Sequence, residues 1–105
     1  MRLTADQLYL RSEYADDPDM KGIISLFVDE LPKRTLAMQE AISQGDRERL
    51  RMLAHRLKGA AGGYGFPQIG EAAALVEAAV KEDLEPNVVR SRMGTLVALA
   101  ARVRE

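Results

Sequence analysis

The stretch "DRERLRMLAHRLKGAAGGYGFP", residues 46–67, decides how this chain folds. It has the periodicity of an amphipathic helix, with Leu50, Leu53 and Leu57 on one side. It also contains the only histidine of the chain, His55, followed by half of the chain's eight glycines. Each glycine inside a helix costs up to about 1 kcal/mol relative to alanine. The concentration of glycines beside a single imidazole therefore requires an explanation from the surrounding residues.

The composition is that of one globular domain, residues 1–105. Apolar residues make up 47% and charged residues 30% of the chain, and aromatic residues are few. The formal net charge of −1 argues against a protein whose main task is to bind nucleic acid or an anionic membrane. Because there is no cysteine, disulfides, thiol catalysis and zinc–thiolate sites are excluded. The N-terminus has no apolar stretch long enough for a signal peptide and no segment approaches a membrane span, so we expect a cytoplasmic protein.

A long amphipathic helix is predicted to begin within "DDPDM", residues 16–20. This stretch offers Asp17 as N-cap and Pro18 as the first helical residue. Pro32 lies inside the apolar pattern, which resumes in phase beyond it, so Pro32 predicts a kink and not an end. The predicted apolar face comprises Met20, Ile24, Phe27, Leu31, Met38 and Ile42.

Three further amphipathic helices follow at short intervals. Gly45 ends the first helix and Asp46 starts the second. Gly65 ends the second helix and Pro67 starts the third. The break "EDLEPN", residues 82–87, precedes the fourth. The residues predicted to face inward are Leu50, Leu53, Leu57, Ala61 and Tyr64 in the second helix, Ile69, Ala72, Ala73, Val76, Ala79 and Val80 in the third, and Val89, Met93, Leu96, Ala100 and Val103 in the fourth.

The predicted fold class is all-α. Four amphipathic helices joined by short loops must be antiparallel neighbours, which gives an up-down-up-down four-helix bundle. The stretch "TADQ", residues 4–7, has the form of a capping box and predicts a short extra N-terminal helix. No segment alternates with period two, so we expect no strands.

His55 is predicted to point away from the core. At about 100° per residue, Leu53, Leu57 and Tyr64 cluster on one side of the second helix, and His55 lies opposite them. The residues that share its face are Arg51, Lys58, Gly59 and Gly62. Because the two glycines lack side chains, the helix surface beside the imidazole is open, and Lys58, three residues on, is within reach of the same spot.

This face combines an exposed nucleophile, His55, with the ammonium group of Lys58 and with space left by the two glycines through which a partner can reach the ring. Imidazole is a good nitrogen nucleophile near neutral pH, and phosphoryl transfer requires little from a protein beyond positioning and charge stabilisation. Other chemistries fit poorly. A metal site has one histidine and otherwise only carboxylates to draw on, no serine lies in a nucleophile elbow, and the glycine spacing is that of neither a P-loop nor a Rossmann fingerprint. Without a nucleotide site, the chain could not phosphorylate itself.

The stretch "AHRLKGAAGGYG", residues 54–65, resembles the signature of histidine-containing phosphotransfer (HPt) domains, roughly H-x-[LIF]-K-G-[SAG]-[AS]-x-x-[LIVFY]-G. The resemblance extends over nearly the whole chain, through "GDRERLRMLA" and the order of the four helices. It implies that His55 is the phosphorylated residue, that Lys58 stabilises the phosphoryl charge and that Gly59 admits the partner. Gly65 would end the helix.

The stretch "GGYGFPQIGEAAALVE", residues 62–77, is also similar to the phosphorylatable domain of chemotaxis histidine kinases. In those domains a glutamate of the following helix hydrogen-bonds the ring nitrogen that is not phosphorylated, and Glu77 falls at the matching place. Glu77 shares a helix face with Gly70, Ala74 and Lys81, so it could reach sideways to His55. The alternative is a solvated glutamate that pairs with Lys81 at i+4.

The resemblance implies a phosphorelay intermediate of two-component signalling, which accepts a phosphoryl group on His55 and exchanges it with a receiver-domain aspartate. Two alternatives stay open: a receiver-docking adaptor of the same fold that carries no phosphate, and the phosphoacceptor domain of a larger histidine kinase. The expected partners are a receiver domain, a histidine kinase or both, which dock on the face of Arg51, Gly59 and Gly62. We expect a monomer that has no cofactor and binds neither nucleic acid nor membrane. Any Mg²⁺ would be bound by the partner receiver domain.

Overall fold

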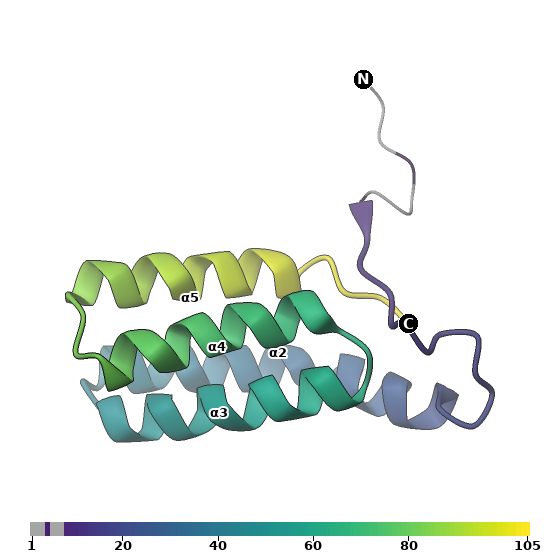
Figure 1. The fold of residues 1–105 in the computed structure, drawn as a ribbon, viewed down its shortest axis with the longest axis horizontal. Coiled ribbons are helices and arrows are strands. Elements are labelled where there is room, and N and C mark those ends of the chain that lie inside the picture. The colour runs from purple at the N-terminus through teal and green to yellow at the C-terminus, as the bar shows by residue number, and fades with distance from the viewer. Residues whose placement is uncertain (1–3, 5–7) are drawn as a thin grey trace.

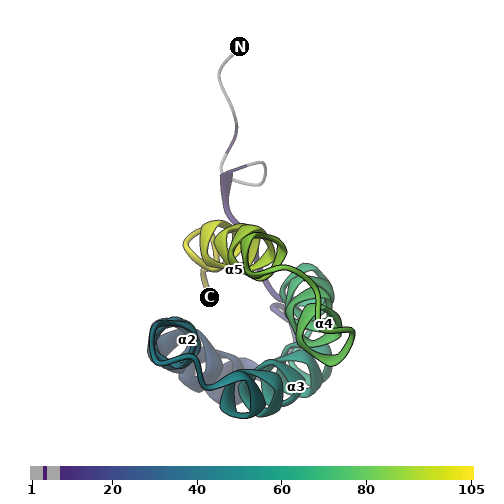
Figure 2. The ribbon, with the colours of Figure 1, turned by 90° about the vertical axis from the view of Figure 1, so that its left-hand side faces the viewer.

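Four helices make up most of the computed structural model, which describes Thr4 and residues 8–105 (Figure 1). Neighbouring helices run in opposite directions, and the end-on view shows them as an arc from α2 through α3 and α4 to α5 (Figure 2). The predicted all-α four-helix bundle is confirmed. The short helix predicted from residues 4–7 lies, except for Thr4, outside the described residues. The helices span Lys21–Ser43 (α2), Arg47–Gly63 (α3), Pro67–Lys81 (α4) and Pro86–Ala100 (α5).

The two ends of α3 are determined by capping residues that can be recognised in the sequence. Asp46 is the N-cap, and its side chain accepts a hydrogen bond from the Arg49 N–H at 3.1 Å. Gly65 follows the C-cap with a φ of +85°, a conformation that only glycine adopts without steric cost. Pro67 then occupies the first turn of α4, where a missing N–H is tolerated. The predicted boundaries around Gly45–Asp46 and Gly65–Pro67 are therefore confirmed.

The predicted start of the long helix at Asp17 and Pro18 is wrong, because α2 begins at Lys21. Asp17 uses its carboxylate to accept the N–H of Asp19, two residues on, at 2.9 Å, and its carbonyl accepts the N–H of Met20 at 3.1 Å. An aspartate that closes a turn on itself in this way competes with its use as a helix cap. Beyond this turn α2 continues through Pro32 without ending.

The core lies between the four inward helix faces, and its largest fully buried side chains are Leu31, Met38, Leu57, Ile69, Val76 and Leu96. The predicted stripes supply nearly all of it. Some of their members are only half-buried at its edge, among them Met20, Ile42, Leu53, Tyr64 and Val80. The Phe27 ring of α2 packs against the rings of Tyr64 and Phe66, each at a centroid distance of 5.4 Å, and so joins α2 to the α3–α4 turn.

Val103 is buried as predicted, but it does not belong to the fourth helix, since α5 ends at Ala100. The chain turns at residues 101–102 and then pairs with Leu10 at Val103. The Leu10 N–H donates to the carbonyl of Arg102, and the Arg104 N–H donates to the carbonyl of Leu10, both at 2.8 Å. This isolated bridge is not part of a strand, and the described part of the chain has none. None of the described helices combines the length and the apolar character that crossing a membrane requires.

The α3–α4 turn is covered by the segment before α2. The Ser12 hydroxyl donates to the Tyr64 carbonyl at 2.6 Å and accepts the Tyr14 N–H at 3.0 Å, and the Glu13 N–H donates to the Gly65 carbonyl at 2.8 Å. Ser12 is buried by these contacts. The turn at Gly65 is thus fixed both by its own backbone conformation and by the segment packed on it.

We predict that Gly65→Ala lowers the free energy of unfolding by about 1–3 kcal/mol, measured by chemical denaturation. The positive φ is strained for alanine, and the added Cβ would lie 2.5 Å from Ser12 Oγ and 2.9 Å from Tyr14 Cδ2. Gly94→Ala in α5 is the control, because nothing lies within 4 Å of its added Cβ. That variant should be stabilised by up to about 1 kcal/mol. Equal effects of the two substitutions would contradict the account of the turn.

Candidate functional site

His55 lies midway along α3, on the face that points away from the core. Its side chain is 65% exposed, whereas Leu57, two residues on, is fully buried. The chain therefore presents its only imidazole to solvent from a rigid helix. This is the orientation that the helical periodicity of residues 46–67 predicts.

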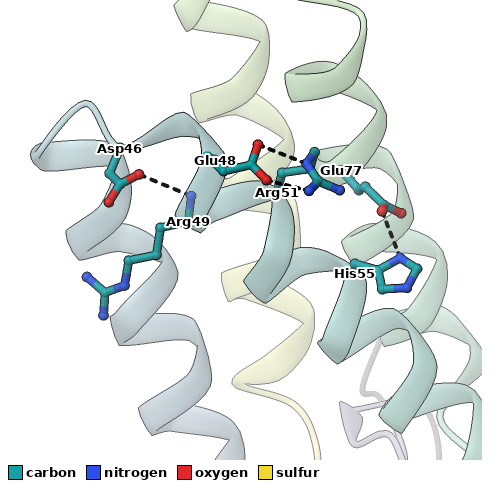
Figure 3. A network of polar contacts seen from close by, with 6 residues as sticks. All are labelled: Asp46, Glu48, Arg49, Arg51, His55 and Glu77. Atoms are coloured by element: carbon teal, nitrogen blue, oxygen red, sulfur yellow. Dashed lines mark hydrogen bonds and ion pairs between the residues drawn. The ribbon is translucent and has the colours of Figure 1, made fainter.

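Glu77 reaches His55 from the neighbouring helix. Its Oε2 atom lies 2.8 Å from His55 Nδ1, within hydrogen-bond distance (Figure 3). Unlike the histidine, the Glu77 side chain is only 7% exposed. The alternative of a solvated glutamate at this position is therefore wrong. The exposed ring is held at one nitrogen by a buried carboxylate.

The second oxygen of the same carboxylate faces Lys58. The distance between Lys58 Nζ and Glu77 Oε1 is 3.6 Å, and the Lys58 side chain is 50% exposed. Glu77 thus lies between the imidazole and the ammonium group, with one oxygen towards each. The structure brings together three of the residues that the sequence singles out.

The charge state of Glu77 decides what the site can do. Burial on its own would raise the pKa of Glu77. The hydrogen bond with His55 and the positive charges of His55, Lys58 and Lys81 outweigh burial and hold the pKa of Glu77 below its ordinary value. The carboxylate is therefore ionised near neutral pH. It accepts hydrogen bonds and has no proton to donate.

The ionised carboxylate fixes the proton of the neutral imidazole. Since Glu77 Oε2 accepts, Nδ1 of His55 must be the donor and carries the hydrogen. In a neutral ring the lone pair is then on Nε2. Figure 3 shows this nitrogen on the side of the ring that points away from Glu77. The geometry leaves one nucleophilic nitrogen, and that nitrogen faces outward.

An open strip of α3 adjoins the ring. Gly59, Gly62 and Gly63 are all exposed, and a Cβ added to any of them would meet nothing within 4 Å. Each lies inside the helix, so the absence of a side chain, and not an unusual backbone conformation, is what distinguishes these positions. A large group can approach the ring along this strip.

Gly70, which helical periodicity places on the face of Glu77, has a role in the site that the sequence pattern did not predict. It faces α3 so closely that an added Cβ would lie 3.4 Å from the Lys58 carbonyl oxygen and 3.7 Å from the Gly62 nitrogen. Gly70 is buried, and it lies two turns before Glu77 on the same face of α4. In the sequence, a glycine on the same face as Glu77 was the signal that could have indicated close packing of α4 against α3. Close approach of the helices here is what lets Glu77 reach across.

Arg51 lies one turn before His55, and its guanidinium is bound to Glu48 (Figure 3). Arg51 Nε lies 3.2 Å from Glu48 Oε2 and Arg51 Nη2 lies 2.5 Å from Glu48 Oε1. The hydrogen bond and the opposite charge lower the pKa of Glu48 and raise that of Arg51. Helical periodicity places Arg51 on the His55 face but does not predict its pairing with Glu48. No three His, Asp or Glu side chains of the described chain gather where they could hold a metal ion.

Comparison with protein families matches residues 22–105 to the family model described as "Hpt domain". The match covers α2 to α5 and therefore includes every residue of the site. Neither the comparison with curated proteins nor the comparison with solved structures finds a match.

We predict that Glu77→Gln flattens the pH dependence of stability on the acid side. Because folding lowers the pKa of Glu77, its ionised form stabilises the protein above the unfolded pKa of about 4.3, and this contribution is lost as the pH falls through the folded pKa. The free energy of unfolding of the wild type should therefore rise, relative to that of Glu77→Gln, as the pH increases through the acid range towards the unfolded pKa of about 4.3. Denaturation curves at a series of pH values test this. Parallel pH profiles would show that the pairing of Glu77 adds nothing.

Proposed function

The chain belongs to the Hpt domain family, and on that premise we propose that His55 carries a phosphoryl group and exchanges it with an aspartate of a response-regulator receiver domain. Hpt domains serve histidine phosphotransfer in two-component signalling and are carriers, not catalytic kinase domains. The observation that supports this role most is the pairing of an exposed imidazole with an ionised, buried carboxylate. That pairing leaves Nε2 of His55 as the nucleophile.

The transfer step follows from this protonation state. The Nε2 lone pair attacks the phosphorus of an aspartyl phosphate, an N–P bond forms, the P–O bond to the aspartate breaks, and the aspartate leaves as a carboxylate. Nδ1 keeps its proton, so the ring becomes cationic, and Glu77 stabilises that charge through the 2.8 Å hydrogen bond. The reverse reaction regenerates the neutral ring. Positioning and electrostatics are the main contributions that such a step requires from a protein.

Lys58 supplies the positive charge for the phosphoryl group. A phosphoryl group carries close to two negative charges, and Lys58 lies three residues from His55 on the same helix face. Its side chain is half-exposed, and its ammonium group lies 3.6 Å from Glu77, a distance at which the attachment is weak enough to exchange for a phosphoryl oxygen. Arg51, on the same face, adds a charge that steers an acidic receiver pocket towards His55.

The carrier requires no cofactor of its own in this proposal, and any Mg²⁺ is bound by the receiver domain. It acts as a monomer in the cytoplasm, where it meets a receiver domain, a histidine kinase or both. Two other roles fit the same fold: an adaptor that docks receivers without carrying phosphate, and the phosphoacceptor domain of a larger histidine kinase. The presence of both His55 and Lys58 favours a phosphoacceptor over the adaptor.

We predict that the phosphoryl group is attached to His55 at Nε2. Incubation with a phosphorylated receiver domain should give label on this chain that is lost in acid and stable in base, and ³¹P and ¹⁵N NMR should identify the Nε2 isomer. His55→Gln should accept no label but should still fold, with some loss of stability because Glu77 loses the pairing with the imidazole. Transfer that survives in His55→Gln would exclude the carrier role, and attachment at Nδ1 would contradict the assigned proton position.

We predict that Gly59 acts by leaving space for the partner. Gly59→Ala should raise the free energy of unfolding by up to about 1 kcal/mol, because the position is helical and open. Gly59→Gln should fold equally well but slow transfer from a receiver domain, because its longer side chain obstructs the approach to His55. Transfer rates of the two variants, each compared with its unfolding curve, provide the test. A normal rate in Gly59→Gln would require another explanation for the glycine.

A further inference from the structure

Glu48, in the first turn of α3, holds Arg51 by a two-point contact. The two residues are three apart, which places them on one helix face, and both nitrogens of the contact belong to one guanidinium. Glu48 is 73% exposed and Arg51 is 35% exposed, so the pair lies at the surface. Exposed pairs of this kind contribute little to stability. The Glu48–Arg51 pair therefore contributes little to the free energy of unfolding.

Arg51 has a second acidic neighbour, which is Glu77. The charge of Glu77 acts on Arg51 and raises its pKa, after the larger effects of the hydrogen bond and charge of Glu48. Figure 3 shows Arg51 between Glu48 and the carboxylate that holds His55. The face thus alternates in charge, from Glu48 to Arg51 to Glu77, and Glu77 is in turn shared between His55 and Lys58.

A competition for Glu77 follows from this alternation. An arginine binds a carboxylate with two parallel hydrogen bonds, which is a stronger and more specific contact than a lysine or an imidazole makes. If Arg51 were released from Glu48, Glu77 would be the other anion whose charge acts on its guanidinium. A guanidinium on both oxygens of Glu77 would displace the His55 Nδ1–H and the Lys58 ammonium from them.

We propose that Glu48 is a positioning residue for the His55 site, because it binds Arg51 and so keeps the guanidinium off Glu77. Glu48 touches neither the imidazole nor a transferred group, and it acts only through Arg51. The predicted effect of Glu48 on the tautomer of His55 does not depend on any partner protein. The consequence for phosphorylation rests on the function proposed above.

The tautomer of His55 is the direct readout. Long-range ¹H–¹⁵N NMR of the single histidine, in the intact chain at a pH where the ring is neutral, should show the Nδ1–H form in the wild type. Glu48→Gln should shift the population towards the Nε2–H form. Glu48→Gln combined with Arg51→Gln should restore the wild-type spectrum, since no guanidinium is then left to compete. Glu40→Gln, at an exposed glutamate on α2, controls for the loss of one negative charge and should change nothing.

The rate of phosphorylation by phosphoramidate, a small donor that releases ammonia, is the second readout. Glu48→Gln should slow labelling of His55 by about threefold, the size expected when one exposed ion pair replaces another. The double variant should recover, because labelling by phosphoramidate does not use the proposed role of Arg51 in steering a receiver domain. An unchanged tautomer in Glu48→Gln would overturn the proposal. So would a change that persists in the double variant, because Arg51 would then not be the mediator. A tautomer shift that the double variant reverses, with no labelling of any variant, would support the role of Glu48 and count against the proposed function.

Discussion

The tight reversal between α3 and α4 is the constraint on which the site depends. His55 and Glu77 are 22 residues apart in sequence, yet their side chains meet at 2.8 Å. In an antiparallel helical pair, residues at similar distances on either side of the turn lie opposite each other, because both helices rise 1.5 Å per residue. A longer or looser turn would change that register. The left-handed Gly65, covered by Ser12 and Glu13, keeps the turn short, and Gly70 lets the helices approach closely.

The site joins an exposed nucleophile to a buried anchor. A buried carboxylate is unfavourable unless it is paired, and the partners of Glu77 are the two residues with assigned functional roles, His55 and Lys58. The hydrogen bond that helps to keep Glu77 ionised therefore also orients the imidazole of His55. Exposure of the ring keeps Nε2 accessible, while burial of Glu77 keeps solvent from competing for Nδ1. Stability and chemistry are linked here through one carboxylate.

The sequence predicted those features that local rules decide. The cap at Asp46, the glycine turn at Gly65 and the outward direction of His55 each depend on residues within one or two helical turns. The start of α2 and the place of Val103 depend on distant contacts: Asp17 closes a turn instead of capping a helix, and Val103 is buried by pairing with Leu10. A helical wheel placed Glu77 on a lateral face but could not decide between His55 and Lys81, because that choice depends on how closely α3 and α4 pack.

The five glycines of α3, α4 and the turn between them fall into two physical classes. At Gly65 the backbone itself requires glycine, and at Gly70 the neighbouring helix lies at contact distance. At Gly59, Gly62 and Gly63 neither reason applies, since each is helical, exposed and unobstructed. Alanine at any of these three positions would stabilise an isolated helix by up to about 1 kcal/mol. Gly22 and Gly94 are equally helical, exposed and unobstructed, so an open glycine alone does not mark a site. What distinguishes Gly59, Gly62 and Gly63 is that they lie on the helix that carries His55, where the space they leave fits the approach of the partner proposed above.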